Sequence, residues 1–156
     1  MEQAVNRAWR HRPHMPSAVS WLLTGWIAWL LFYHEQFKLN AAEGSIGGVF
    51  QPFANWFGLP GHEPLFRRGV ALREFAAATL VINQPTRWFG ALMTMGLMGG
   101  AVFLHALGPI GIDPYNDGAV LLNEACFIFL VALSLLVLHR DEAVGFVSGL
   151  RSPARA

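Results

Sequence analysis

The sequence predicts an all-α membrane protein built as a bundle of four transmembrane helices. Of its 156 residues, 54% are hydrophobic and 13% are charged, and the mean hydropathy is +0.39. Soluble domains carry about 25% charged residues, so much of this surface is not designed to face water. Four apolar runs, at about 17–34, 65–82, 88–107 and 119–138, approach the ~20 residues with which a helix crosses ~30 Å of hydrocarbon. The length accommodates one domain, 1–156.

The third and fourth runs have no polar face, which a helix of a soluble bundle would need. The second run is weaker because Arg73 and Glu74 interrupt it. The first follows Arg7, Arg10 and Arg12, as the core of a signal peptide would. It is long for such a core, however, and bulky and charged residues follow it where small ones are needed for cleavage. We therefore expect the first run to remain as a helix.

Basic residues predict the orientation. Arginines precede the first run, Arg87 lies in the short turn between the second and third, and Arg140 and Arg151 follow the fourth. We expect an integral protein of the bacterial cytoplasmic membrane, and the positive-inside rule predicts that both of its termini lie in the cytoplasm. A net charge of +1 and the lack of a basic patch argue against nucleic acid as a partner.

The first outer loop contains an amphipathic segment at about 46–57. Its apolar residues recur at the steps of one helix face: Ile46, Val49, Phe50, Phe53, Trp56 and Phe57. We expect a helix that lies in the membrane interface or folds over the bundle as a lid, and the interfacial placement is favoured. In the second outer loop, Asp117 is placed to cap the fourth helix.

Six ionisable residues lie within or at the ends of the apolar runs: Glu35, Lys38, Arg73, Glu74, His105 and Glu124. A charge at the centre of a bilayer costs about 3 kcal/mol or more unless it meets a partner or water. The predicted connectivity brings all six to the outer half of the bundle. This half is therefore the predicted site, with Lys38, Arg73, Glu74, His105 and Glu124 as candidate ligand-binding residues, and no comparable group is expected at the inner ends.

Small residues predict which faces point inward. They share a face of the second helix with Glu74 (Ala77, Ala78 and Val81) and form a small-xxx-small pair in the third (Gly96 and Gly100). Such faces let helix backbones approach closely, so we expect both to face the interior of the bundle. Glu74 would then meet Lys38, Arg73 or His105. The six residues fit either a structural salt-bridge network or a site for a ligand or a proton, and less well a solvated rim.

Other chemistry is less well supported. His34 and His105 could ligate a haem between the first and third helices, but histidines at helix ends are more often interfacial. Met93, Met95 and Met98 are spread around their helix, which favours core packing over a copper site. No residue pattern predicts a bound metal, and Cys126 is expected to be a small buried hydrophobe. The sequence has no phosphate loop, HExxH motif or nucleophile elbow.

The chain resembles the DoxX-like integral membrane proteins from about Trp21 to His139. The matching stretches are Phe37-Lys38-Leu39, Phe57-Gly58-Leu59-Pro60, Arg73-Glu74, Gln84-Pro85-Thr86-Arg87-Trp88 and Gly100-Ala101-Val102-Phe103-Leu104-His105. The resemblance implies a four-helix membrane bundle in a family that includes the large subunit of thiosulfate:quinone oxidoreductase. It also implies polar positions at Lys38, Glu74, Arg87 and His105. The long first outer loop and Asn123-Glu124 depart from the family pattern.

Two functions follow as hypotheses. In the first, a redox-associated protein binds a quinone or similar small molecule: Lys38 or His105 hydrogen-bonds a carbonyl, and Glu74 or Glu124 handles the proton. In the second, the chain is a non-catalytic accessory or assembly subunit of a membrane oxidoreductase, and its buried charges are structural. Either way any enzyme activity needs a partner subunit, because no electron carrier is visible in the chain. Transport is a less favoured function. The sequence does not determine whether the protein forms a homo-oligomer.

Overall fold

A computed structural model describes residues 18–151, with side chains to Phe146. The arginines at positions 7, 10, 12 and 155 lie outside the described residues. Within residues 18–151 the chain forms six α-helices and no strand. The helices are α2 (Ala18–Leu39), α3 (Gln51–Trp56), α4 (Glu63–Ile82), α5 (Arg87–Ala106), α6 (Val120–Leu138) and α7 (Arg140–Arg151). A π-helical turn, η1 (Ser45–Phe50), precedes α3, and the 3-10 turns η2 (Pro60–His62) and η3 (Gln84–Thr86) flank α4.

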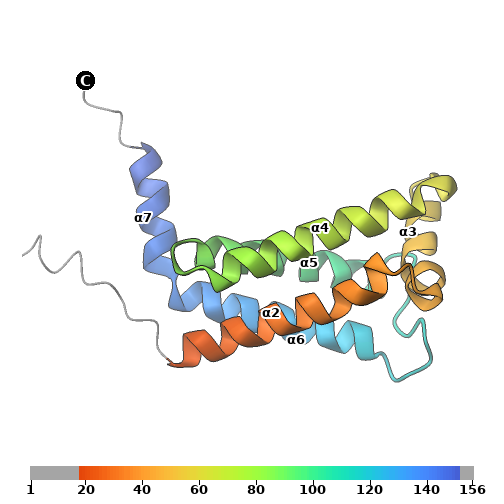
Figure 1. Cartoon of the computed structure of the whole chain (residues 1–156), viewed down its shortest axis with the longest axis horizontal. Coiled ribbons are helices and arrows are strands. Elements are labelled where there is room, and N and C mark those ends of the chain that lie inside the picture. The colour runs from red at the N-terminus through yellow and green to blue at the C-terminus, as the bar shows by residue number, and fades with distance from the viewer. Residues whose placement is uncertain (1–17, 152–156) are drawn as a thin grey trace, which may run out of the picture.

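The four long helices lie alongside one another, as the sequence predicts (Figure 1). α5 packs chiefly on α4 and α6, and α2 packs chiefly on α4. α3 crosses one end of this bundle, and α7 leaves the opposite end at a steep angle (Figure 1). We call these the α3 end and the α7 end. α2 continues to Leu39, beyond the predicted boundary at 34, so Glu35 and Lys38 belong to the helix itself.

Two segments among the described residues are long and apolar enough to cross a membrane: Gln84–Ala106, which contains α5, and Val120–Leu138, which is α6. α2 and α4 do not meet the same criterion. α2 ends in a turn that contains Glu35 and Lys38, and α4 contains Arg73 and Glu74 midway along its length.

The interior of the bundle is lined by branched and small apolar side chains. It includes Ile27, Leu31, Ala77, Ala78, Val81, Ala91, Ile128, Ala132 and Leu135. The prediction for the second helix is confirmed, because Glu74, Ala77, Ala78 and Val81 are all buried. The prediction for the third helix is wrong. Gly96 and Gly100 are exposed with open space beside them, because α5 turns its Ala91, Thr94 and Met98 face inward instead.

The close approach on α5 is made by Gly90. A Cβ atom at this position would lie 2.4 Å from the backbone nitrogen of Val81 on α4. Only a residue without a side chain fits there, because the neighbouring atoms belong to a helix backbone and cannot move aside.

Gly90→Ala is expected to destabilise the protein by about 1–3 kcal/mol, because the added methyl forces α4 and α5 apart. Gly96→Ala is the matched control on the same helix. It adds a methyl into open space and should leave stability unchanged or slightly higher, as alanine favours helix over glycine. Unfolding of both variants in mild detergent measures the difference. Equal stability of the two variants would contradict the close approach.

The segment predicted at 46–57 is helical and packs on the α3 end of the bundle. The Phe53 and Phe57 rings lie 5.0 and 5.7 Å from the ring of Phe66 on α4. Trp56 lies 6.3 Å from Phe103 on α5. The side that faces the bundle contains Ala54, which is fully buried. The segment therefore packs across the end of the bundle, a position that fits both placements that the sequence suggests, the membrane interface and a lid.

The loop between α5 and α6 is held by two aspartates and a tyrosine. The Tyr115 hydroxyl donates to the Gly44 carbonyl at 2.9 Å, which joins this loop to the first one. The Asp117 carboxylate accepts the Val120 N–H at 3.0 Å, so it bonds the first N–H of the fourth helix as predicted, although Ala119 occupies the N-cap position itself. The Asp113 carboxylate accepts the backbone N–H groups of Asp117 at 3.0 Å and of Gly118 at 3.1 Å.

These N–H groups, that of Asp117 foremost, hold the pKa of Asp113 below its usual value. A carboxyl with a lowered pKa stabilises the folded loop above its unfolded pKa, and this contribution is lost as the pH falls through the lowered value. Hydrogen-exchange protection of the Asp117 and Gly118 amides is therefore expected to decrease on acidification. In Asp113→Asn the protection should be lower already at neutral pH. Asp141→Asn, on an exposed side chain of α7, should change neither amide.

The helix α7 was not predicted by the sequence analysis. It begins two residues after α6 ends, and its first turn contains Arg140, Asp141 and Glu142. Charged residues beyond the fourth apolar run were interpreted only as an orientation signal. The Phe146 ring lies 5.3 Å from that of Trp88, which places α7 against the start of α5.

Candidate functional site

A buried ion-pair network joins α2 to α4 near the α3 end. The Lys38 ammonium donates to the Glu74 carboxylate at 2.6 Å and to the Glu35 carboxylate at 3.4 Å. All three side chains are buried, with 5–9% of each residue exposed. Glu35 and Lys38 face α4 together because they lie three residues apart, nearly one helical turn. Lys38 is thus the partner of Glu74 among the three that the sequence suggested.

Arg67 and Glu63 extend this network toward the first loop. Arg67 donates to the Glu63 carboxylate at 2.7 Å, and its guanidinium also donates to the Lys38 carbonyl at the end of α2. Both side chains are buried. The sequence analysis missed both residues, although their i, i+4 spacing is the spacing of a helical ion pair. Each charged side chain in this network has a partner within the protein. The geometry is therefore that of a structural network that holds α2 against α4.

The other predicted site residues lie apart from this network. Arg73 is exposed and forms no ion pair among the described residues, because it lies on the outer face of α4. His105 is buried, but its Nδ1 donates to the Gly111 carbonyl at 2.8 Å and holds the chain that leaves α5. Glu124 pairs with His34, whose Nε2 lies 3.0 Å from the carboxylate. The single site expected from six residues is therefore divided among separate places.

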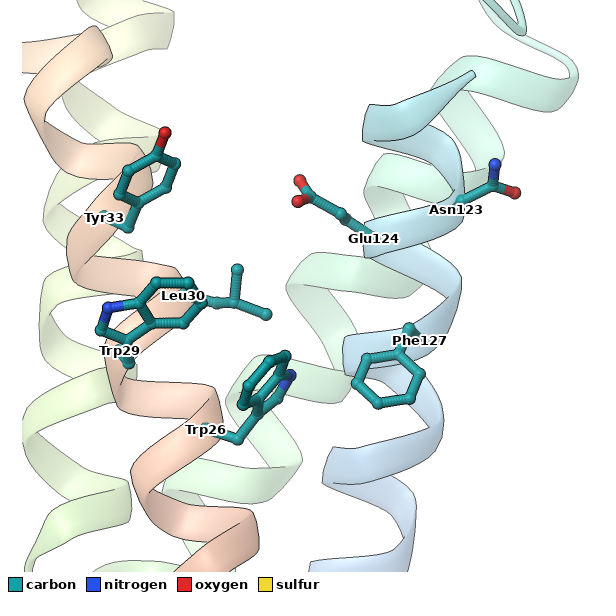
Figure 2. A pocket seen from close by; sticks show the side chains of 7 residues that line it. All are labelled: Trp26, Trp29, Leu30, Tyr33, Asn123, Glu124 and Phe127. Carbon is teal, nitrogen blue, oxygen red and sulfur yellow. The ribbon is translucent and has the colours of Figure 1, made fainter. Parts of the chain in front are cut away.

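The pair formed by His34 and Glu124 stands beside a groove between α2 and α6. The groove has a volume of about 490 Å³. It is lined by Trp26, Trp29, Leu30, Tyr33, Asn123, Glu124 and Phe127. Figure 2 shows the Trp26 and Phe127 rings between the two helices, with the Glu124 carboxylate above them and directed toward α2. The Asn123 amide points away from α2 and donates to the Gly118 carbonyl at 3.2 Å.

Aromatic side chains form much of the wall of this groove. The Trp29 ring stacks on Tyr33 at 5.7 Å, and Trp26 lies edge-on to Phe127 at 6.1 Å. The polar groups gather at the end nearest α3, where the Glu124 carboxylate can accept hydrogen bonds and the Tyr33 hydroxyl can donate one. An apolar groove with a few polar groups at one end can hold a flat lipophilic molecule in a single orientation. Of the predicted site residues, Glu124 is the one that lines the groove.

A second polar network lies at the α7 end, where the sequence analysis expected none. Arg87 is fully buried and donates to the Val81 carbonyl at 3.1 Å, the Ile82 carbonyl at 3.3 Å and the Ser20 hydroxyl at 3.2 Å. Its guanidinium also lies 4.2 Å above the ring of Trp21. Arg87 itself was the signal in the sequence, because an arginine directly before an apolar run can point into the bundle as well as toward the cytoplasm.

His139 and Glu142 continue this second network. The Ser20 hydroxyl lies 2.8 Å from His139 Nε2, and the Glu142 carboxylate lies 2.9 Å from His139 Nδ1. The order of serine, histidine and carboxylate matches that of a hydrolytic triad. However, Ser20 is 2% exposed and the Arg87 guanidinium lies against its hydroxyl, so a substrate carbonyl has no approach to the oxygen. The network ties α2, α5 and α7 together.

Cys126 is exposed on α6, contrary to the expectation that it is buried. The interior face of that helix is formed instead by Ala125, Ile128 and Ala132. The chain matches no known family model, no curated protein and no solved structure.

Proposed function

We propose that this chain is a four-span integral membrane protein that binds a quinone, or a similar flat lipophilic molecule, in the groove between α2 and α6. The observation that carries the proposal is an aromatic groove with the Glu124 carboxylate at one end, paired with His34 beside the groove. The proposal agrees with the expectation from the DoxX-like resemblance that the protein is redox-associated. It moves the binding site from the Lys38 network to Glu124.

Large apolar side chains on the outer faces of all four long helices support a membrane location. They include Leu22 and Trp29 on α2, Leu65 and Leu72 on α4, Phe89 and Phe103 on α5, and Leu130 and Val137 on α6. Soluble proteins rarely expose contiguous apolar surface on this scale. Glu35, Lys38 and Glu74 lie inside and are paired, which is the arrangement that a bilayer requires of charged groups. Arg73 is exposed midway along α4, so this proposal requires its long side chain to extend toward the headgroups.

Aromatic residues at both ends support the same four spans. Trp21 and Trp88 lie at the α7 end, and Trp56 and Tyr115 lie at the α3 end. Tryptophan and tyrosine concentrate at the two interfaces of a membrane. With Arg140 beyond α6, the positive-inside rule places the α7 end and both termini in the cytoplasm and the α3 end outside.

A quinone fits the groove for chemical reasons. Its flat ring can stack on the Trp29 and Tyr33 rings. Each such aromatic contact contributes about 0.5–1.5 kcal/mol of binding free energy beyond that from the buried area. A quinone carbonyl accepts a hydrogen bond from the Tyr33 hydroxyl or an indole N–H. When a partner subunit supplies two electrons, the quinone takes up two protons and becomes a quinol. His34 can pass one of these protons to Glu124, which delivers it to the quinone oxygen, and the second proton comes from water. The isoprenoid tail would leave between α2 and α6 into the lipid.

Binding of decylubiquinone to the purified full-length protein tests this proposal. Glu124→Ala is expected to weaken binding about tenfold, which corresponds to ~1.4 kcal/mol. Trp29→Leu should weaken it similarly through lost stacking. Glu74→Gln and Trp56→Leu are matched controls outside the groove, and in folded protein neither should change the affinity. Quinone binding that is insensitive to Glu124 and Trp29, or no binding, would contradict the proposal.

The second candidate function is a non-catalytic accessory or assembly subunit of a membrane oxidoreductase. The internal pairing of Lys38 with Glu35 and Glu74 favours it, because that network leaves no polar group for a ligand. Native mass spectrometry of protein purified from its own membrane in mild detergent separates the two candidates. A retained quinone that is lost in Glu124→Ala supports the groove. A protein that arrives without quinone but with a partner subunit supports the accessory role.

A further inference from the structure

We infer that α7 lies in the plane of the membrane, at the boundary between headgroups and acyl chains, and binds the lipid surface through its exposed apolar side chains. The inference rests on the proposed membrane location of α2, α4, α5 and α6, but not on quinone binding. It assigns the last described helix to the same bilayer that the long helices cross.

The position of α7 along the bundle follows from its connection to α6. α6 ends at Leu138 and α7 begins at Arg140, so a single residue separates an apolar candidate span from the next helix. A chain with one residue between two helices cannot place the second far from the end of the first, since each residue spans at most ~3.6 Å. The first turn of α7 therefore lies at the level where α6 leaves the hydrocarbon. α7 then turns sharply away from the bundle axis (Figure 1).

Two contacts fix the direction in which α7 leaves the bundle. Glu142, in its first turn, is hydrogen-bonded to His139, which in turn contacts Ser20 on α2. One turn later, Phe146 packs against Trp88 at the beginning of α5. The first half of α7 is thus attached to the bundle at two points on one side. This attachment holds its axis across the end of the bundle rather than in line with α6.

The exposed surface of α7 is suited to an interface between lipid and water. Val144 is 67% exposed among the described residues, and Phe146 is 55% exposed beyond its contact with Trp88. The Asp141 side chain, 77% exposed, and the Arg140 side chain, 76% exposed, provide charge at the same end. A helix with apolar and charged sides buries its apolar side ~5–10 Å into the interface. Arginine beside that apolar side can extend its guanidinium to the headgroups.

A lipid surface fits this helix better than a protein partner because of what surrounds it. The neighbouring aromatic residues, Trp21 and Trp88, are of the type that marks the membrane interface. The apolar side chains of α7 continue from the apolar surface of α6 without an intervening polar segment longer than its first turn.

Spin labels in the full-length protein test the inference. The protein is reconstituted in vesicles of phosphatidylethanolamine and phosphatidylglycerol. Cys126, the single cysteine of the chain and exposed on α6, carries the reference label in the natural sequence. In a Cys126→Ser background, Val144→Cys and Asp141→Cys carry the other two labels. Collision of each label with oxygen, which concentrates in lipid, is compared with collision with a water-soluble nickel complex.

We expect the ratio of oxygen to nickel collisions to be highest at Cys126, intermediate at Val144 and lowest at Asp141. A label at Val144 that is as accessible to nickel as the label at Asp141 overturns the inference. A label at Val144 that is protected from both reagents also overturns it, because the covering molecule is then protein. If the Cys126 label collides freely with nickel, the four-span proposal fails as well. The reference label therefore separates failure of the inference from failure of the proposal beneath it.

Discussion

Lys38→Met is expected to destabilise the protein by about 3–5 kcal/mol, the usual cost of leaving a buried charge without its partner. The substitution keeps the length of the side chain but removes the ammonium that the Glu35 and Glu74 carboxylates share. Two acidic groups would then face each other in a buried site. The free energy of unfolding, measured by denaturant titration in mild detergent, tests this prediction.

Two further variants show whether the loss comes from the unpaired charges. Arg73→Met removes a cation from the residue next to Glu74 in sequence, but this cation is exposed, so stability should change by less than about 0.5 kcal/mol. The double variant Lys38→Met, Glu74→Leu should recover part of the loss, because one unpaired carboxylate is removed with its partner. If Lys38→Met is as stable as the unmodified protein, the network does not hold α2 against α4.

Arg87→Ala is expected to cost about 3 kcal/mol or more. The fully buried guanidinium donates to the Val81 and Ile82 carbonyls and to Ser20. Hydrogen bonds from a charged donor contribute about 1.5–3 kcal/mol each, and the carbonyls would lose a partner without gaining water. The same unfolding titration measures the loss, which should be accompanied by faster hydrogen exchange where α4 meets α5.

Arg87→Lys should recover little of this stability. An ammonium cannot match the planar fork that serves several acceptors and also stacks on the Trp21 ring. Arg140→Ala is the matched control, because its side chain is 76% exposed and lies at the same end of the protein. It should change stability by less than about 0.5 kcal/mol. Full recovery by lysine would mean that only the charge of Arg87 matters.

The sequence alone was sufficient to predict the long helices. Three of the four apolar runs are uninterrupted over the length of a span, and only the second is interrupted, by Arg73 and Glu74. Helix formation depends on residues that are close in sequence. The same local pattern predicted the helical segment before Pro60 and the capping hydrogen bond of Asp117, which are confirmed in the structure. The local pattern did not predict α7, because the charged residues of its first turn resemble those of an exposed C-terminal tail. The number of helices that cross the membrane remains a prediction, since two candidate spans are identified where four were expected.

The grouping of the polar residues was decided by the tertiary structure. The sequence indicated that Glu74 and its small neighbours face inward, and this is confirmed, because residues on one helix face share one environment. The predicted connectivity of the helices placed Lys38, Arg73 and Glu124 at a similar depth along the bundle. Which side chains meet, however, depends on the rotation of each helix about its own axis. That rotation directs Lys38 to Glu74, turns Arg73 outward and pairs Glu124 with His34.

The amino-acid sequence is sufficient to predict the helices, the inward face of α4 and the presence of charges that need partners. The partners of these charges, the groove between α2 and α6 and the buried Arg87 network become visible only when the helices are packed together. The difference lies in the range of the interactions. Helix formation and facial periodicity are set within a few residues. A groove or a buried ion pair depends on the packing of helices distant in sequence, where small residues such as Gly90 decide the approach.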